Sequence, residues 1–284
     1  FIWGTTFIAQ ETGMENIGPY VFNSVRFFVG FIALIPFYFF LEKKNTIKII
    51  SKNKKKFLIL SFLIGIFLFF ASVFQQVALV YTDVANAAFF TIFYVPMVPI
   101  IVFFLFKKKI HWSVWPSVFL CVIGGYFLTN FQDATVRLGD TLVIICALFW
   151  SLHIIFIGII IEEFNAPILI GLIQTLVVST FSLVPGLMFE EFVLSDILSH
   201  KIQILYAGIL SGGIAFVLQI YAQKNIQPAP SAIIFSLEGV FATAAAWIIL
   251  NQILDLNNIL GCTFILAGVL ISQLLPEIKK SKHK

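Results

Sequence analysis

Long apolar segments with almost no charge recur along this chain, and they constrain its fold more than any other feature. Ten such segments can be delimited in its 284 residues. A transmembrane helix needs about 20 predominantly apolar residues to cross the hydrocarbon core of a bilayer. Hydrophobic residues make up 60% of the chain and charged residues 11%, against about 45–50% and about 25% in soluble domains. The composition therefore predicts a polytopic membrane protein and argues against a soluble enzyme, a nucleic-acid-binding protein or a secreted disulfide scaffold.

We interpret the ten segments as the transmembrane helices of an all-α polytopic membrane protein. Short connections that contain Gly, Pro, Asn or Asp separate many of them, as expected where helices end and the chain turns. The expected segments are 1–10, 19–41, 57–80, 84–106, 112–129, 139–161, 166–189, 202–223, 229–250 and 256–275. The first is half the usual length and opens with Phe1, so we expect further residues to precede it in the natural protein.

Basic residues are unevenly divided between the two predicted sides of the membrane. One side receives the connections after the second, fourth and eighth segments and the C-terminal tail, and it holds 15 Lys residues. The other side holds two basic residues, Arg137 and Lys201. Because Lys-rich and Arg-rich loops stay in the cytoplasm, both termini are predicted to be cytoplasmic, with 276–284 as a basic tail. The Lys-rich connection 42–56 is expected to contact anionic lipids rather than to form a regulatory or nucleic-acid site.

The two halves of the chain repeat one another weakly. A shift of 147 residues places Trp3 on Trp150, and a shift of 144 residues aligns further positions. These are Ala78 with Ala222, Ala85 with Ala229, Ala88 with Ala232, Tyr94 with Glu238, and Gly124 with Gly268. Each half contains five predicted helices, and five is odd, so the second half must enter the membrane from the opposite side. Two inverted repeats, 1–130 and 139–275, are therefore predicted, an architecture common among secondary transporters.

Several short motifs occur in a characteristic order. They are Trp3-Gly4-Thr5-Thr6-Phe7, Arg26, residues 78–89, Tyr94-Val95-Pro96-Met97-Val98-Pro99, Pro228-Ala229, residues 236–242, and Gly261 to Gly268. With this set the whole chain resembles EamA-type members of the drug/metabolite transporter superfamily. The resemblance implies ten helices in two EamA repeats, export or uptake of small metabolites, and a bacterial inner membrane. The chain departs from the family pattern at three places, with Gly239 where Pro is usual, and Lys107-Lys108 and Asn251-Gln252 where Gly-Glu is usual.

Two charged side chains inside predicted helices are the main candidates for substrate binding. A charge near the middle of a membrane helix costs about 2.5–3.5 kcal/mol, so it persists where a cavity or a partner offsets that cost. Arg26 can bind a substrate carboxylate or phosphate through its guanidinium fork, and Glu238 can bind a proton or a substrate amine. The alternative for both is a structural role, including an Arg26–Glu238 ion pair.

Other polar and aromatic residues complete the predicted substrate site. The amides Gln75, Gln174 and Gln219 can reach a central cavity, although hydrogen bonding between helices is the usual role of such residues. The aromatic residues Trp3, Tyr94 and Trp150 can stack on an apolar or cationic substrate, with packing as the alternative. We expect no metal site, no cofactor and no catalytic residue.

These features favour a secondary transporter for small organic metabolites, such as amino acids, working by alternating access, with possible proton coupling. The sequence lacks a Walker A motif, so ATP is not expected to drive transport directly. Phosphorylated or nucleotide-linked substrates are the first alternative, but they would need several basic residues in the cavity. A membrane-embedded enzyme or a channel is the other alternative. It is disfavoured because the sequence has no HExxH motif and no pair of intramembrane aspartates.

Overall fold

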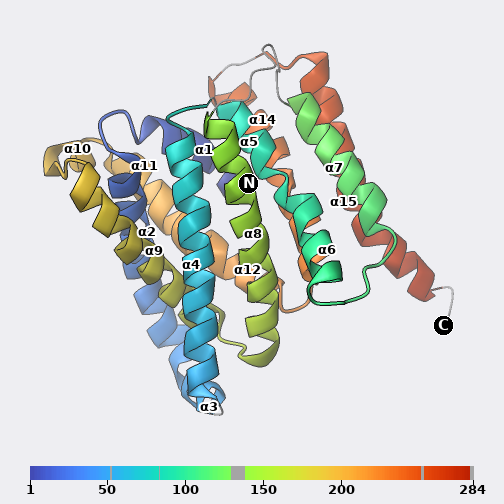
Figure 1. Ribbon diagram of the computed structural model, residues 1–284, viewed down its shortest axis with the longest axis horizontal. Helices are drawn as coiled ribbons and strands as arrows, with labels where there is room; N and C mark the ends of the chain where they lie inside the picture. Colours follow the sequence, from blue (N-terminus) through green and yellow to red (C-terminus); the bar gives the residue numbers. More distant parts are fainter. Residues whose placement is uncertain (52, 83, 129–137, 251–252, 282–284) are drawn as a thin grey trace.

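The computed structural model describes residues 1–51, 53–82, 84–128, 138–250 and 253–281, and the regular structure of these residues is entirely helical (Figure 1). The first half forms α1 (Ile2–Thr12), α2 (Pro19–Phe37), η1 (Tyr38–Glu42), α3 (Lys43–Ile50), α4 (Lys54–Ala78), α5 (Val84–Thr91), α6 (Tyr94–Phe104) and α7 (Val114–Leu128). The second half forms α8 (Leu138–Glu163), α9 (Pro167–Phe189), α10 (Leu194–Ser199), α11 (Lys201–Leu205), η2 (Tyr206–Ala215), α12 (Phe216–Ala222), α13 (Pro228–Phe235), α14 (Leu237–Leu250) and α15 (Leu256–Ser281). The stretches η1 and η2 are π-helical and continue the helices beside them.

Most of the helical segments are long and apolar enough to span a membrane. Within the described ranges, eight helical segments are long and apolar enough to cross a bilayer, and α7 is a shorter apolar helix of 15 residues. The prediction of an all-helical polytopic membrane protein is confirmed. A count of ten also requires α7 and the 11-residue α1 to be spans, and that count stays a prediction.

The predicted helices at 84–106 and 229–250 correspond to the spanning segments Ala87–Phe104 and Pro228–Ala245, and each contains a short break in its α-helical hydrogen bonding. In the first, α5 ends at Thr91 and α6 begins at Tyr94; in the second, α13 ends at Phe235 and α14 begins at Leu237. Phe93 and Ser236 at the two breaks keep right-handed helical dihedral angles, so hydropathy registers each segment as continuous. The connection 42–56 also differs from expectation, because it contains the eight-residue α3.

Carboxylate caps join α2 and α9 at both ends of the pair. Glu42, at the end of η1, accepts hydrogen bonds from two backbone N–H groups in the first turn of α9, at 2.8 and 2.9 Å. Glu190, directly after α9, accepts from two N–H groups in the first turn of α2, at 3.0 and 2.7 Å. The first N–H groups of a helix have no partner within it. Each helix therefore provides the cap that its neighbour needs.

The two caps are related by one constant shift along the chain. Adding 148 to the acceptor Glu42 gives the acceptor Glu190, and adding 148 to the donors of the Glu190 cap gives the donors of the Glu42 cap. Both helices also begin with proline, which brings no backbone N–H of its own. A Cβ atom on Gly18 would lie 2.1 Å from the carboxyl carbon of Glu190, so a larger residue there would displace the capping carboxylate. This correspondence links the beginnings of the two repeats.

Glycine contacts hold other helix pairs close together. A Cβ atom on Gly124 of α7 would lie 2.7 Å from the carbonyl oxygen of Gly261 in α15, and one on Gly208 of η2 would lie 2.5 Å from that of Arg26 in α2. Small residues let helix backbones approach in this way within membranes. Figure 1 shows α7 and α15 side by side at one edge, whereas α2 packs against α9 at the other. The largest apolar cluster joins α6, α7, α8, α13 and α15 between them.

Removing either carboxylate cap is expected to destabilise the bundle. Loss of a helix N-cap costs about 0.5–2 kcal/mol, so Glu42→Ala and Glu190→Ala should each lower the free energy of unfolding by about 1–2 kcal/mol. The measurement is equilibrium unfolding of the purified protein in detergent micelles. Glu191→Ala is the matched control, because Glu191 is exposed beside Glu190. Equal losses in all three variants would contradict the proposed role of the caps.

Candidate functional site

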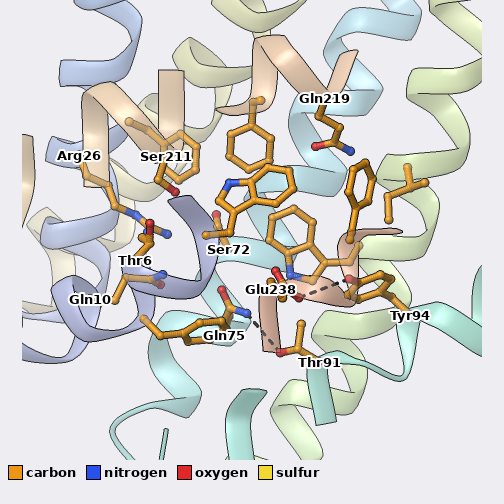
Figure 2. A pocket seen from close by; sticks show the side chains of 17 residues that line it. Thr6, Gln10, Arg26, Ser72, Gln75, Thr91, Tyr94, Ser211, Gln219 and Glu238 are labelled. Atoms are coloured by element: carbon orange, nitrogen blue, oxygen red, sulfur yellow. Dashed lines mark hydrogen bonds between the residues drawn. The ribbon is translucent and has the colours of Figure 1, made fainter. Parts of the chain in front are cut away.

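A pocket in the interior of the bundle is lined by residues of both halves of the chain (Figure 2). The first half supplies residues of α1, α2, α4, α5 and α6, and the second half supplies residues of α8, η2, α12, α13 and α14. The lining residues are Trp3, Thr6, Phe7, Gln10, Arg26, Phe27, Ser72, Gln75, Thr91, Tyr94, Trp150, Ile154, Ser211, Phe216, Gln219, Phe235 and Glu238. Seven of the eight predicted site residues are therefore brought to one pocket. The exception is Gln174.

The two helix interruptions place a pair of polar side chains at this pocket. Tyr94 is the first residue of α6, and Glu238 lies in the first turn of α14. The Tyr94 hydroxyl donates a hydrogen bond to Glu238 Oε1 at 3.3 Å. These two residues are the pair that a shift of 144 residues aligns. The hydrogen bond thus joins equivalent positions of the two halves.

Arg26 is buried in the opposite wall of the pocket, with 4% of its surface exposed. Its Nε and Nη2 atoms donate to Asn23 Oδ1 at 3.0 and 2.8 Å, and its guanidinium carbon lies 4.9 Å from the centre of the Phe27 ring. The ion pair with Glu238 that the sequence allowed is not formed; among described residues, the ion pair found joins Lys56 and Glu163. Arg26 and Glu238 therefore face one pocket as separate charges.

Figure 2 shows how the polar groups are distributed. Arg26 lies with Thr6 and Gln10 on one side of the pocket, and Glu238 lies with Tyr94, Thr91 and Gln75 on the other side. Gln75 donates to Thr91 Oγ1 at 3.2 Å, which ties α4 to α5 at the second side. The pocket consequently has a cationic end and an acidic end.

Aromatic rings lie between these groups. Trp3 contacts Phe216 with ring centres 5.2 Å apart, and Trp150 stacks on Phe216 at 5.9 Å. The indole nitrogens of both tryptophans are buried without a hydrogen-bond partner, as are Gln10 Oε1 and Gln219 Oε1. Buried polar atoms normally have partners. Unpaired donors and acceptors in a pocket wall are suited to a polar ligand or to water.

Gln174 lies in α9, away from the pocket lining. It is fully buried and its Oε1 lies 3.0 Å from His153 Nε2 of α8, so it makes the hydrogen bond between helices that was its alternative role. Sequence reasoning missed other members of the lining, including Thr6, Gln10 and Ser72. Their signal was weak, because single small or uncharged polar residues in apolar helices usually bond to neighbouring helices. In the described part of the chain, no group of three or more His, Cys, Asp or Glu side chains could hold a metal ion.

An apolar helical bundle around a pocket shared by two halves, with separate buried charges in its wall, defines the class of a multi-pass membrane transporter. A profile of the EamA-like transporter family matches residues 1–130 and again residues 137–274. The chain belongs to this family and contains its domain twice. It is a membrane transporter and not an enzyme.

Known relatives extend over nearly the whole chain. An uncharacterized transporter from Archaeoglobus fulgidus is 29% identical over 273 residues, which span 96% of this chain and 82% of the relative. The uncharacterized transporter YoaV from Bacillus subtilis is 24% identical over 282 residues, spanning 95% of this chain and 92% of YoaV. A solved structure described only as a crystal structure of protein is 16% identical, with a TM-score of 0.77 over 97% of this chain and 94% of its own, and shows a similar fold.

The Tyr94–Glu238 hydrogen bond predicts a measurable coupling between the two halves. Double-mutant cycles for hydrogen bonds between membrane helices average about 0.6 kcal/mol and reach about 1.7 kcal/mol. We expect Tyr94→Phe and Glu238→Met to show a coupling energy of that size in equilibrium unfolding. The control cycle combines Tyr221→Phe with Glu238→Met, since Tyr221 is exposed on α12. A coupling energy of zero in the first cycle would contradict the hydrogen bond.

Proposed function

We propose that this chain is a secondary transporter that moves small organic metabolites, amino acids or related compounds, across a membrane by alternating access. The observation that carries the proposal is the pocket that both halves line, with Arg26 and Glu238 in its wall and no ion pair between them. Buried charges are costly in a membrane and mark substrate or ion pathways. An amino acid carries one carboxylate and one ammonium group, which complement these two charges.

We also propose that the pocket residues predicted from sequence bind the substrate. Arg26 pairs with the carboxylate, and Glu238 pairs with the ammonium group or carries a proton. The rings of Trp3 and Trp150 cover the apolar part of the molecule. Gln75, Gln219 and Tyr94 provide hydrogen bonds around it. Gln174 acts only indirectly in this scheme, through the wall that α8 and α9 form.

The proposed architecture is ten membrane helices in two inverted repeats, residues 1–130 and 139–275. The constant shift of 148 residues between the caps on α2 and α9 supports it, because each cap joins the end of one helix to the beginning of its equivalent. Repeats of opposite orientation can exchange conformations around a fixed site. In such an exchange the pocket opens first to one side of the membrane and then to the other.

Both termini are proposed to be cytoplasmic in a bacterial inner membrane. Figure 1 shows α3, the connection between α6 and α7, and the end of α15 at one end of the bundle, and α10 at the other. The first three carry eight of the 16 Lys residues, and Lys54, Lys55 and Lys56 begin α4. This end is proposed to face anionic lipids. Arg137, Asn251-Gln252 and the last three residues of the tail 276–284 lie outside the described residues.

Phosphorylated or nucleotide-linked substrates fit the pocket less well. A phosphate monoester carries a charge of about −1.5 to −2 at pH 7. Among the lining residues, Arg26 is the one Lys or Arg side chain, and Glu238 adds a carboxylate. A singly charged carboxylate is balanced by Arg26 alone, whereas a phosphate is not.

Transport assays on reconstituted protein test the proposed function. Proteoliposomes should take up a radiolabelled amino-acid mixture above the level of empty liposomes, and uptake should rise with an imposed pH gradient. Glu238→Gln removes the proposed proton carrier, so uptake by this variant should no longer depend on the gradient. Glu191→Gln, a change on the exposed surface, is the matched control and should behave like the wild type.

Two other outcomes would revise the proposal. If uptake is independent of the pH gradient in both the wild type and the variant, the chain is a transporter but Glu238 is not its proton carrier. Failure to take up any amino acid would contradict the proposed substrate class.

The proposed orientation is tested by cysteine labelling in intact cells. In a variant that lacks the native cysteines, Ser195→Cys on α10 should react with a membrane-impermeant thiol reagent from outside. Lys55→Cys on α4 should react only after the cells are permeabilised. Both positions are exposed. The reverse pattern would invert the assigned topology.

A further inference from the structure

The positive charge of Arg26 has a neutral partner. Both of its hydrogen bonds end on one amide oxygen, Asn23 Oδ1, and they occupy its Nε and Nη2 atoms. Arg26 is 4% exposed and lines the pocket. A buried charge is costly unless an opposite charge meets it. The hydrogen bonds to Asn23 therefore satisfy two nitrogen atoms of the guanidinium group but do not neutralise its positive charge.

Asn23 itself is fixed by the helices around it. Its Nδ2 atom donates to Ser72 Oγ at 3.1 Å and to Ser182 Oγ at 2.9 Å, which joins α2 to α4 and α9. Because a guanidinium can only donate, Asn23 must present its oxygen to Arg26, and its amide group has one possible orientation. The fork of Nε and Nη2 is therefore held by Asn23. The Nη1 atom makes no hydrogen bond within the described structure.

This arrangement suits a single carboxylate. An arginine guanidinium offers two edges to a planar acid, one through Nε and Nη2 and one through Nη1 and Nη2. Asn23 occupies the first edge, so the second remains for a ligand. An acidic residue at position 23 would hold the same edge and would also balance the charge. The neutral amide keeps the charge available.

We infer that Asn23 is a specificity-determining residue that aims Arg26 at the pocket and, by being neutral, reserves its charge for one substrate carboxylate. The inference rests on the proposed function, in which the pocket binds the substrate. Asn23 lies outside the pocket lining. In this inference it nevertheless determines whether the pocket binds a free carboxylate more tightly than the corresponding neutral amide.

The test compares acids with their amides on the full chain in lipid nanodiscs. The probes are the 20 proteinogenic amino acids and the matching C-terminal amides, with dissociation constants measured by thermostability titration. A charged hydrogen bond is worth about 10- to 100-fold in affinity, so the wild type should bind its best acid about 10- to 100-fold more tightly than the amide. Asn23→Asp should reduce this ratio to less than about threefold, because its carboxylate balances Arg26 before the ligand arrives.

A second variant covers the case in which Asn23→Asp does not fold. Asn23→Leu removes the acceptor and adds no charge, so it should weaken binding of the acid about tenfold and leave binding of the amide unchanged. Ser24→Ala is the matched control. Ser24 is buried on α2, and its hydroxyl donates to the Ser179 carbonyl oxygen at 2.9 Å, whereas both Arg26 hydrogen bonds go to Asn23. Its ratio of acid to amide affinity should equal that of the wild type.

Two results would overturn the inference, and they differ from one another. If the wild type prefers acids and both Asn23 variants weaken acid and amide binding equally, Asn23 is structural only, and the proposed function stands. If the wild type binds none of the amino acids, the proposed substrate class fails and this assignment fails with it.

Discussion

The hydrocarbon core of a membrane contains no water to satisfy a free backbone N–H or C=O group, and much of this structure follows from that constraint. Within a helix the backbone groups satisfy one another, and those at its ends need other partners. The helices α2 and α9 solve the problem together, since Glu42 and Glu190 each cap the other helix. The interruptions near Tyr94 and Glu238 lie inside the bundle, where protein surrounds them and their side chains form part of the pocket wall.

The class of the protein and seven of the 17 pocket-lining residues could be predicted from the sequence because they depend on sparse, strong signals. A charge such as Arg26 or Glu238 stands out in an apolar helix, since its burial needs a physical reason. Tryptophan is similarly conspicuous when it recurs at equivalent positions, as Trp3 and Trp150 do. The shift that aligned Tyr94 with Glu238 even paired two residues that share a hydrogen bond.

Other features leave little trace in the sequence. Hydropathy averages over a segment, so it registers α5 and α6 as one apolar stretch although a turn separates them. The same pattern could not distinguish Gln75, which lines the pocket, from Gln174, which bonds to His153. That difference depends on how each helix is rotated and packed against its neighbours, which the hydropathy pattern does not indicate. The environment of Asn23 was hidden for the same reason, because its partners come from α4 and α9.

The number of residues that separates equivalent positions of the two repeats differs along the chain, which indicates where the repeats have diverged in length. Equivalent positions are 147 residues apart at Trp3 and Trp150, 148 apart at the α2 and α9 caps, and 144 apart at Tyr94 and Glu238. The offset changes between helices and stays constant across both ends of the capped pair. The first repeat is longer than the second between Glu42 and the end of α4, and this is where α3 lies. Insertions and deletions were thus accepted in or beside the connections, while helix lengths that set the cap geometry were retained.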